Sequence, residues 1–297
     1  MFVRADRLLR GERVSWYSRH ALWYYWDGFR PHLDLFDLEK QEMESLDLAR
    51  RLRTVDLVVS EERECVGSFD GPSYVPCPSR SRVSGPFDQC RACAGTWIPV
   101  QECLFEPQCT GDLCDSPLCR KVHVVYATFF GDLVKIGMTA GSRLEERAIE
   151  QGADAVVRLS EFPNRLAARD AEKDISRKLR APQRVLGRQV AAEIARSPRE
   201  SELKEKYERI SASIGNDYEL LGERMLILDG YPGRDRLAEL QAPPELAMVA
   251  GSHSGNLLGL KGRYLFYEDM EGKALMLAMS ELPSRFLELA GERDNRG

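Results

Sequence analysis

The pattern of apolar and polar residues is clearest in the middle of the chain, where it predicts a β-hairpin. Residues 122–129 form an apolar run of strand length. Gly131-Asp132 has the residue types of a two-residue hairpin turn, and residues 133–138 supply the returning strand. We therefore expect an antiparallel strand pair at the start of a central structural unit.

Two helices and one more strand are predicted after the hairpin. The first helix begins at Ser142, whose spacing to Glu145 is that of a capping box, and ends at Gly152. Residues 156–159 predict a third short strand, and residues 165–179 predict a second helix. A small α/β unit accounts for this order of elements.

The segments on either side of this unit favour β-structure. Residues 14–17 and 21–26 are aromatic and strand-prone, although residues 42–53 are mostly helix-friendly. Near the other end, residues 257–267 and 274–279 predict two strands joined by a turn. The two terminal segments could therefore pair into one small barrel.

The predicted fold class is α+β. At 297 residues the chain is long enough for roughly two domains of ~150 residues each. The composition shifts divide it further into a β-rich N-terminal segment, a cysteine-rich module, a central α/β sandwich and a β-rich C-terminal segment. The expected boundaries are 1–62, 63–120, 121–212 and 213–297.

Composition and charge exclude several classes of protein. The chain is 43% hydrophobic and 30% charged, as in ordinary globular proteins, and its formal net charge is −5. A nucleic-acid site must therefore be a local basic patch. No apolar run approaches the ~20 residues that span a bilayer, and the N-terminus lacks the apolar core of a secretory signal. We expect a cytoplasmic protein without a membrane partner; its oligomeric state stays open.

The eight cysteines cluster in one short part of the chain, which indicates metal binding. Cys90-Arg-Ala-Cys93 is a C-x2-C knuckle of the kind that grips a tetrahedral zinc ion. Eight thiolates suit two structural zinc sites; an iron–sulfur cluster or disulfides are the alternatives. The simplest grouping is Cys65, Cys77, Cys90 and Cys93 for one site, and Cys103, Cys109, Cys114 and Cys119 for the other.

The hairpin register places a phenol beside an ammonium group. It pairs Tyr126 with Gly137 and Thr128 with Lys135, so that Tyr126 and Lys135 share one face of the sheet. A glycine opposite Tyr126 leaves space above that face. This combination suits a phosphate or another anion.

The two helices add a carboxylate and a guanidinium. Glu172 interrupts an apolar stripe that includes Ala168 and Ile175, and a carboxylate there is costly unless it is paired or holds a metal. The alternative is a surface ion pair at the edge of the stripe. On the first helix, Arg147 lies closer to the apolar side than Arg143.

Residues 158–188 form a local basic segment. They hold nine Lys/Arg against four Asp/Glu, a formal charge of +5 within a chain of −5. Such a patch is typical of phosphate-backbone binding. A charged, solvated helix explains the count equally well, and residues 181–210 predict another surface helix.

The order of these motifs resembles the GIY-YIG endonuclease superfamily. Its first motif is represented by Val124-Val125-Tyr126 and its second by Lys135-Ile136-Gly137. The resemblance implies that Tyr126 assists deprotonation of water, Arg147 steadies the scissile phosphate and Glu172 holds Mg²⁺ or Mn²⁺. Lys135 takes the place of the second-motif tyrosine.

A second resemblance covers most of the chain. The cysteine block, the run from Cys119 through Tyr126, Glu150-Gln-Gly-Ala153 and the late Gly259-Leu-Lys-Gly-Arg-Tyr264 are similar to the prokaryotic domain-of-unknown-function family 2797. This resemblance concerns architecture more than activity.

Three functions fit these features. The first is a zinc-containing protein that binds RNA, including tRNA, or DNA on a GIY-YIG-like fold. The second is a divalent-metal-dependent endonuclease with Tyr126, Lys135, Arg147 and Glu172 in its catalytic site. The third is a nucleotide- or RNA-modifying enzyme that uses the same residues.

Overall fold

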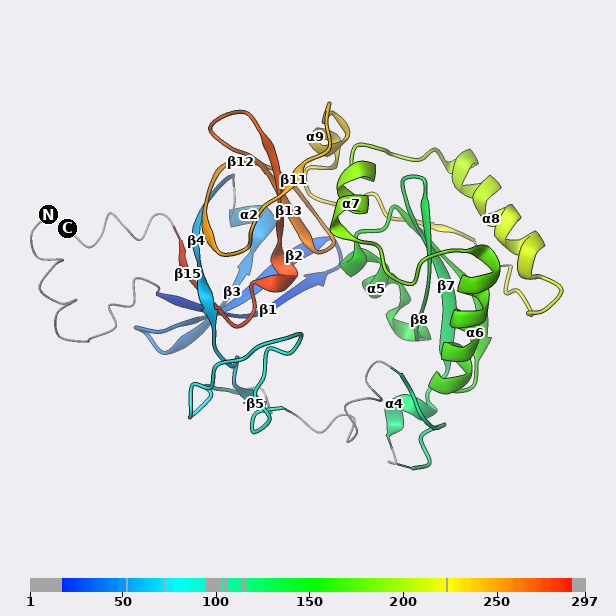
Figure 1. The fold of residues 1–297 in the computed structure, drawn as a ribbon, viewed down its shortest axis with the longest axis horizontal. Coiled ribbons are helices and arrows are strands. Elements are labelled where there is room, and N and C mark those ends of the chain that lie inside the picture. The colour runs from blue at the N-terminus through cyan, green and yellow to red at the C-terminus, as the bar shows by residue number, and fades with distance from the viewer. Residues whose placement is uncertain are drawn as a thin grey trace, which may run out of the picture.

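The fold is built on two large β-sheets, which lie in separate lobes that meet near the middle of the molecule (Figure 1). The structure is a computed structural model. It describes residues 18–51, 53–71, 73–94, 103, 106–113, 116–222 and 224–289. The α+β class predicted from the sequence is confirmed.

The first lobe is a nine-stranded sheet built from both ends of the chain. Its strand order is β11-β14-β13-β12-β4-β15-β1-β2-β3, and every pair is antiparallel except β11 with β14. The strands are β1 (Arg19–Asp27), β2 (Arg30–Asp37), β3 (Glu42–Asp47), β4 (Thr54–Arg63), β11 (Glu245–Leu246), β12 (Gly251–Lys261), β13 (Tyr264–Glu268), β14 (Ala274–Ala278) and β15 (Arg285–Leu289).

Pairing between the terminal segments is confirmed, but the predicted barrel is wrong. The C-terminal strand β15 lies between β1 and β4, and β12 pairs with β4. Among the described residues the sheet is open, with β11 at one edge and β3 at the other. The predicted strand at 21–26 is β1, whereas the one at 14–17 lies outside the described residues.

Half of the helix-friendly segment 42–53 is a strand. β3 pairs along β2, and only the short helix α2 (Leu48–Arg51) follows it. Leu46 is buried in β3, and Leu48 is buried at the start of α2. Burial against the sheet has overridden the intrinsic helix preference of the Glu- and Arg-rich sequence.

The second lobe is a four-stranded sheet with helices packed against it. Its order is β10-β9-β7-β8, with β7 buried along its whole length. The hairpin register is the predicted one, including Tyr126 opposite Gly137 and Thr128 opposite Lys135. The elements are β7 (His123–Phe130), β8 (Leu133–Ala140), α5 (Leu144–Gln151), β9 (Ala155–Phe162), α6 (Arg165–Leu179), α7 (Gly187–Glu193), α8 (Glu200–Ile214) and β10 (Leu226–Ile227).

The helix boundaries in this lobe follow the sequence with one correction. α6 has its predicted bounds, and the Asn164 side chain caps it by accepting a hydrogen bond from the Ala167 N–H at 2.9 Å. Gly152 ends α5 in the left-handed conformation, with φ of 78°. The capping box at Ser142 is wrong, because Ser142 lies in a 3₁₀ turn (Gly141–Arg143) and α5 has no side-chain cap.

The segment 181–210 also differs from its prediction as one solvated helix. It contains α7 and most of α8, and α8 buries Leu203, Ile210 and Ile214. These side chains pack with α6 on one face of the small sheet. α8 is therefore part of the core of this lobe.

The remaining elements are short. They are β5 (Ser68–Asp70) and β6 (Ser73–Val75), which pair in the cysteine-rich segment, with α4 (Pro117–Arg120), α9 (Arg234–Ala238) and the 3₁₀ turn η2 (Met279–Glu281). Within the described ranges, no helix is long and apolar enough to cross a membrane.

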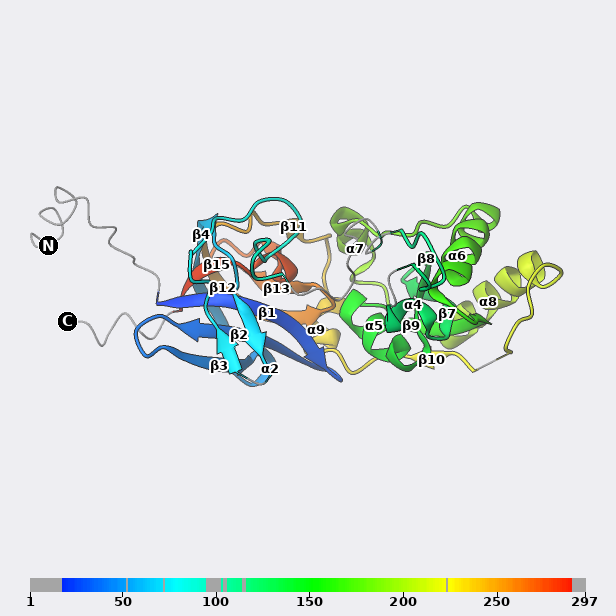
Figure 2. The same cartoon turned by 90° about the horizontal axis from the view of Figure 1, so that it is seen from below.

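One hydrophobic core joins the two lobes. It contains Tyr126 and Ile149 from the small lobe and Trp26, Tyr231 and Leu260 from the large one. In both views α5 and α7 lie between the sheets (Figure 1 and Figure 2). Residues at this junction are therefore held by side chains from both ends of the chain.

Candidate functional site

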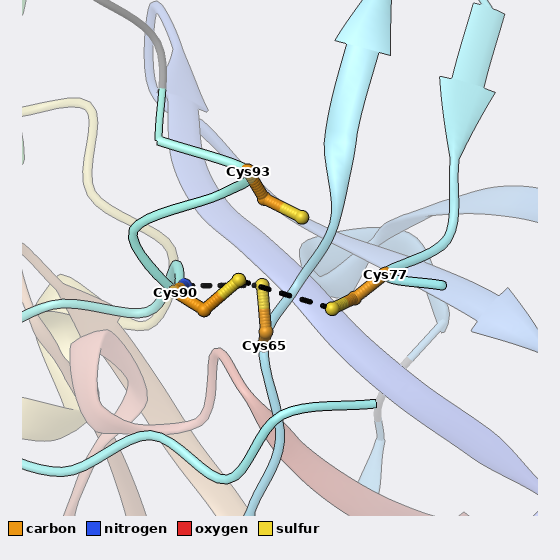
Figure 3. Close-up of side chains that lie close together, drawn as sticks. All are labelled: Cys65, Cys77, Cys90 and Cys93. Atoms are coloured by element: carbon orange, nitrogen blue, oxygen red, sulfur yellow. Dashed lines mark hydrogen bonds between the residues drawn. The ribbon is translucent and has the colours of Figure 1, made fainter. Parts of the chain in front are cut away.

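Four cysteines of the cysteine-rich segment converge on one point. The sulfur atoms of Cys65, Cys77, Cys90 and Cys93 all lie within 4.8 Å of one another, and their side chains point inward (Figure 3). Cys77 Sγ and Cys90 Sγ are 3.9 Å apart. Four thiolates bound tetrahedrally at ~2.3 Å from zinc would be roughly 3.8 Å apart. This donor set can hold a metal ion and is compatible with zinc, as the spacing predicted.

Local hydrogen bonds favour the thiolates of Cys77 and Cys90, whereas burial raises the pKa of Cys65 and Cys93. The backbone N–H groups of Gly67 and Cys90 donate to Cys65 Sγ at 3.4 and 3.1 Å. Although burial opposes ionisation, hydrogen bonds from Ser79 and Ser81 lower the pKa of Cys77 to about 6. A metal held by four thiolates has no open position for substrate, so such a centre stabilises the fold of its segment.

The second predicted zinc group is only partly described. Cys103 and Cys119 are buried, Cys109 is half-buried, and Cys114 lies outside the described residues. Cys109 Sγ accepts a hydrogen bond from the Gly111 N–H at 3.3 Å. No close group of three metal-ligand side chains includes any of these cysteines within the described part of the chain. A second metal site stays a prediction.

Tyr126 and Lys135 meet over Gly137 at the lobe junction. A Cβ atom added to Gly137 would lie 2.7 Å from both the Tyr126 hydroxyl and Lys135 Nζ, so only glycine leaves room for them. Lys135 Nζ is 5.3 Å from the centre of the Tyr126 ring. The Gln151 amide of α5 donates to the Tyr126 hydroxyl at 3.0 Å. The space predicted above the glycine is therefore occupied by these two side chains.

Burial shifts the ionisation of both groups. It raises the pKa of Tyr126, so the phenol stays protonated at neutral pH. It lowers the pKa of Lys135 to about 8, and repulsion from Arg147 and Arg263 acts in the same direction. Within the described residues Lys135 has no ion pair, since Glu172 acts on it only electrostatically.

Glu172 is buried on α6, but its charge is already balanced. Arg169 donates to its carboxylate at 2.6 Å, and the two side chains are 19% and 7% exposed. Arg169 also donates to Glu106 at 3.2 Å and to Gln183 at 3.2 Å. Glu106, which also pairs with Lys173, belongs to the cysteine-rich segment. Of the arrangements left open for Glu172, the structure shows a buried ion pair.

Three arginines, Arg147, Arg184 and Arg263, extend the positive charge beyond Lys135. Arg147 on α5 is 41% exposed and pairs with Glu150 at 2.7 Å. Arg263 comes from the turn between β12 and β13, and its partial burial and repulsion from Arg147 and Arg184 lower its pKa. Arg143 is 52% exposed and pairs with Glu146 on the surface. Arg184 belongs to the basic segment predicted from the sequence, whereas the electrostatic role of Arg263 was not predicted, because Arg263 lies outside the hairpin and its two helices.

Ion pairs neutralise part of the basic segment 158–188. Lys173 and Arg169 pair with Glu106, while Lys178 pairs with Asp174 and Asp217. Glu106 and Asp217 lie outside the counted window, so the formal excess of +5 overstates the local charge. In the described ranges, the arginines of this segment without an ion pair to an acidic residue include Arg180, Arg184 and Arg188. Of these three, Arg180 and Arg184 lie in the α6–α7 loop and Arg188 lies in the first turn of α7.

The comparison with protein families identifies the chain. The family model described as "Protein of unknown function (DUF2797)" matches residues 53–277. The chain belongs to this family. No curated protein and no solved structure matches the sequence.

The DUF2797 match includes both centres described above. It begins at the start of β4, so it contains the four clustered cysteines as well as Tyr126, Lys135 and Glu172. It also includes Arg263, so the matched region contains residues of both lobes at their junction. Strands β1 to β3 precede it.

Proposed function

We propose that this DUF2797 protein binds nucleic acid through the phosphates, at a cationic cluster formed by Lys135, Arg147, Arg184 and Arg263. Zinc at the four-cysteine centre would be structural. The observation that carries the proposal is the convergence of these cations from three separate parts of the chain, beside a phenol and a glutamine amide.

Lys135 is the strongest single indication. Burying an ammonium group without a carboxylate partner costs free energy, which an anionic ligand would recover. The Tyr126 hydroxyl accepts from Gln151 and keeps its own proton, so that proton can be donated to a ligand oxygen. A phosphate here would receive charge-assisted hydrogen bonds from Lys135 and an arginine.

The state of Glu172 favours binding over cleavage. Mg²⁺ sites in proteins use oxygen ligands with free negative charge. In this chain Arg169 already supplies the cation for Glu172, and Glu106 helps to hold Arg169 in place. The raised pKa of Tyr126 also opposes a role for its phenolate as a base.

An endonuclease of GIY-YIG type is the second candidate. The observation that favours it is the electrostatic coupling of Glu172 to both Tyr126 and Lys135, which brings a carboxylate, a phenol and an ammonium into one neighbourhood. Displacement of Arg169 by a divalent cation would then be the first requirement for activity.

Binding can be tested by fluorescence anisotropy with labelled tRNA, single-stranded RNA and DNA over a range of salt concentrations. We expect Arg263→Gln to weaken binding about tenfold and to reduce the salt slope by about 1, as for the loss of one phosphate contact. Arg177→Gln is the matched control, because Arg177 is 75% exposed and pairs with Asp174. Equal losses in both variants, or no binding by the zinc-loaded wild type, would overturn the proposal.

The same preparations separate the two candidates. They are incubated with the same nucleic acids and with branched DNA in Mg²⁺ or Mn²⁺, with Glu172→Gln alongside. Binding without cleavage supports the proposal. Cleavage that disappears in Glu172→Gln would replace it with the nuclease.

A further inference from the structure

The outer face of β1 and β2 presents an aromatic surface that the cationic cluster does not use. Along β1 the side chains alternate: Tyr24 and Trp26 point to the lobe junction, where both donate to the Gly262 carbonyl at 2.7 and 2.8 Å. Trp23 lies on the opposite face and is 58% exposed. A single exposed apolar side chain is ordinary by itself, so the groups around Trp23 decide what this face can bind.

Polar groups surround Trp23 in the sheet. Its cross-strand partner is Asp34, and the next pair on the same face is Tyr25 with His32. The rings of Tyr25 and His32 are stacked, with centroids 5.2 Å apart and planes 14° from parallel. Tyr25 also shares a hydrogen bond with Ser45 of β3 at 3.3 Å. Cross-strand pairs are close enough for one ligand group to touch both members.

Asp34 and His32 have unused hydrogen-bonding capacity. Asp34 Oδ1 and both ring nitrogens of His32 are buried and, among the described residues, lack a partner. No cation pairs with Asp34 in the described ranges, whereas the other aspartates of this face, Asp27 and Asp47, pair with Arg30 and Arg50. Asp34 is therefore a carboxylate beside an open indole ring without its counter-ion.

The charge of the surrounding strands selects the type of ligand. Residues 19–47 contain seven Asp/Glu and three Lys/Arg, a formal charge of −4. Such a surface repels phosphate and attracts cations. Its ligand is thus of the opposite charge to the one proposed for the lobe junction.

We propose that Trp23 and Asp34 form a binding site for an arginine side chain of a partner protein. The flat guanidinium can stack on the indole ring while it donates hydrogen bonds to the Asp34 carboxylate. Hydrogen bonds between a guanidinium and a carboxylate are charge-assisted, and they are stronger where water is excluded. The indole ring of Trp23 would shield the Asp34 carboxylate in this way. This site is independent of the nucleic-acid proposal.

The test follows the indole N–H signals of the ¹⁵N-labelled, zinc-loaded full chain by NMR, with the Trp23 signal assigned through Trp23→Phe. A blocked tetra-arginine peptide is the probe, and tetra-glutamate is the charge-reversed control. We expect tetra-arginine to move the Trp23 signal. Asp34→Asn should weaken this binding about tenfold, and Trp23→Ala, observed through backbone amides, should do the same.

Asp27→Asn is the matched variant. It removes the same charge from the same face, but from a residue already paired with Arg30, and should change the affinity less than twofold. Equal effects of Asp27→Asn and Asp34→Asn would mean diffuse attraction to an acidic surface and would overturn the site. The Trp23 signal is also followed with single-stranded RNA and at increasing protein concentration. If RNA moves the signal and the movement persists in Asp34→Asn, the ligand is a nucleic acid and the proposal is overturned. If protein concentration alone does so, the partner is a second copy of this chain and the proposal is likewise overturned.

Discussion

Gly152 and Gly262 meet backbone to backbone where the two lobes join. A Cβ atom added to Gly262 would lie 2.4 Å from the Gly152 nitrogen, and one added to Gly152 would lie 3.1 Å from Gly262 Cα. Both glycines have positive φ, of 78° and 57°. Gly262 also accepts the hydrogen bonds from Tyr24 and Trp26. The two motifs that carry the family resemblance at Glu150–Ala153 and Gly259–Tyr264 are therefore in direct contact.

Gly262→Ala should open this junction. The methyl group collides with backbone atoms that cannot rotate away, so the loss should exceed the roughly 1–2 kcal/mol of left-handed strain alone. Gly28→Ala is the control, because Gly28 has nearly the same φ, 56°, with nothing within 4 Å of the added atom. Urea unfolding compares the two variants. Equal destabilisation would mean that the contact between the lobes contributes nothing.

Lys135 should make ligand binding depend on pH. With its pKa lowered to about 8, the ammonium is charged below that pH and neutral above it. Affinity for a labelled RNA should therefore fall between pH 7 and 9, by up to about tenfold for one proton. Lys135→Arg should remove this fall because a guanidinium remains charged, and Lys135→Met should bind weakly at both pH values. A wild-type affinity that is flat over this range would contradict the prediction.

Lys135 should also make stability depend on pH, but the free energy of unfolding should rise with pH where the affinity falls. The unfolded chain keeps the ordinary lysine pKa of about 10.4, so between pH 8 and 10.4 it binds more protons than the folded protein. The free energy of unfolding should rise with pH through this window, after subtraction of the Lys135→Met profile. Urea titrations of both proteins at pH 7.5, 8.5 and 9.5 measure the difference. A difference that falls with pH would mean that Lys135 is stabilised as a cation by the fold.

Local signals in the sequence predicted the small lobe well. The turn at Gly131-Asp132 predicted the hairpin register, and Gly152 marks a real helix end. The large sheet was harder because β15 inserts between β1 and β4, and no local pattern encodes a pairing across more than 200 residues. For the same reason the segment 42–53 reads as helix-friendly, although Leu46 pairs with Leu33 of β2 and only Leu48 begins a short helix.

In the candidate site, too, local spacing was predictable from the sequence and contacts between distant segments were not. Spacing along the chain grouped Cys65, Cys77, Cys90 and Cys93 correctly, because a C-x2-C knuckle constrains its own geometry. It placed Glu172 on a buried face but could not identify its partner. Arg169 lies only three residues away, whereas Glu106 and Arg263 reach the neighbourhood through tertiary contacts.

The Arg169–Glu172 pair should behave as a buried ion pair. Arg169→Gln leaves a buried carboxylate without its cation and should cost roughly 3 kcal/mol of unfolding free energy. The double variant Arg169→Gln/Glu172→Gln should recover most of that loss, because no buried charge remains. Arg177→Gln removes the more exposed pair with Asp174 and should cost less than about 0.5 kcal/mol. Additive single losses in the double variant would show that the two residues are not coupled.

Substitution of single cysteines should separate the two groups. Elemental analysis of the wild type should find at least one zinc per chain, and Cys77→Ser should remove one, since three thiolates cannot close the tetrahedral site. Because this segment is short of apolar side chains, loss of the ion should also expose it to limited proteolysis. Cys109→Ser leaves the first centre intact. If the wild type holds two ions and Cys109→Ser holds one, the remaining cysteines form the second predicted site. If both variants keep the wild-type content, the cluster around Cys65 does not bind zinc.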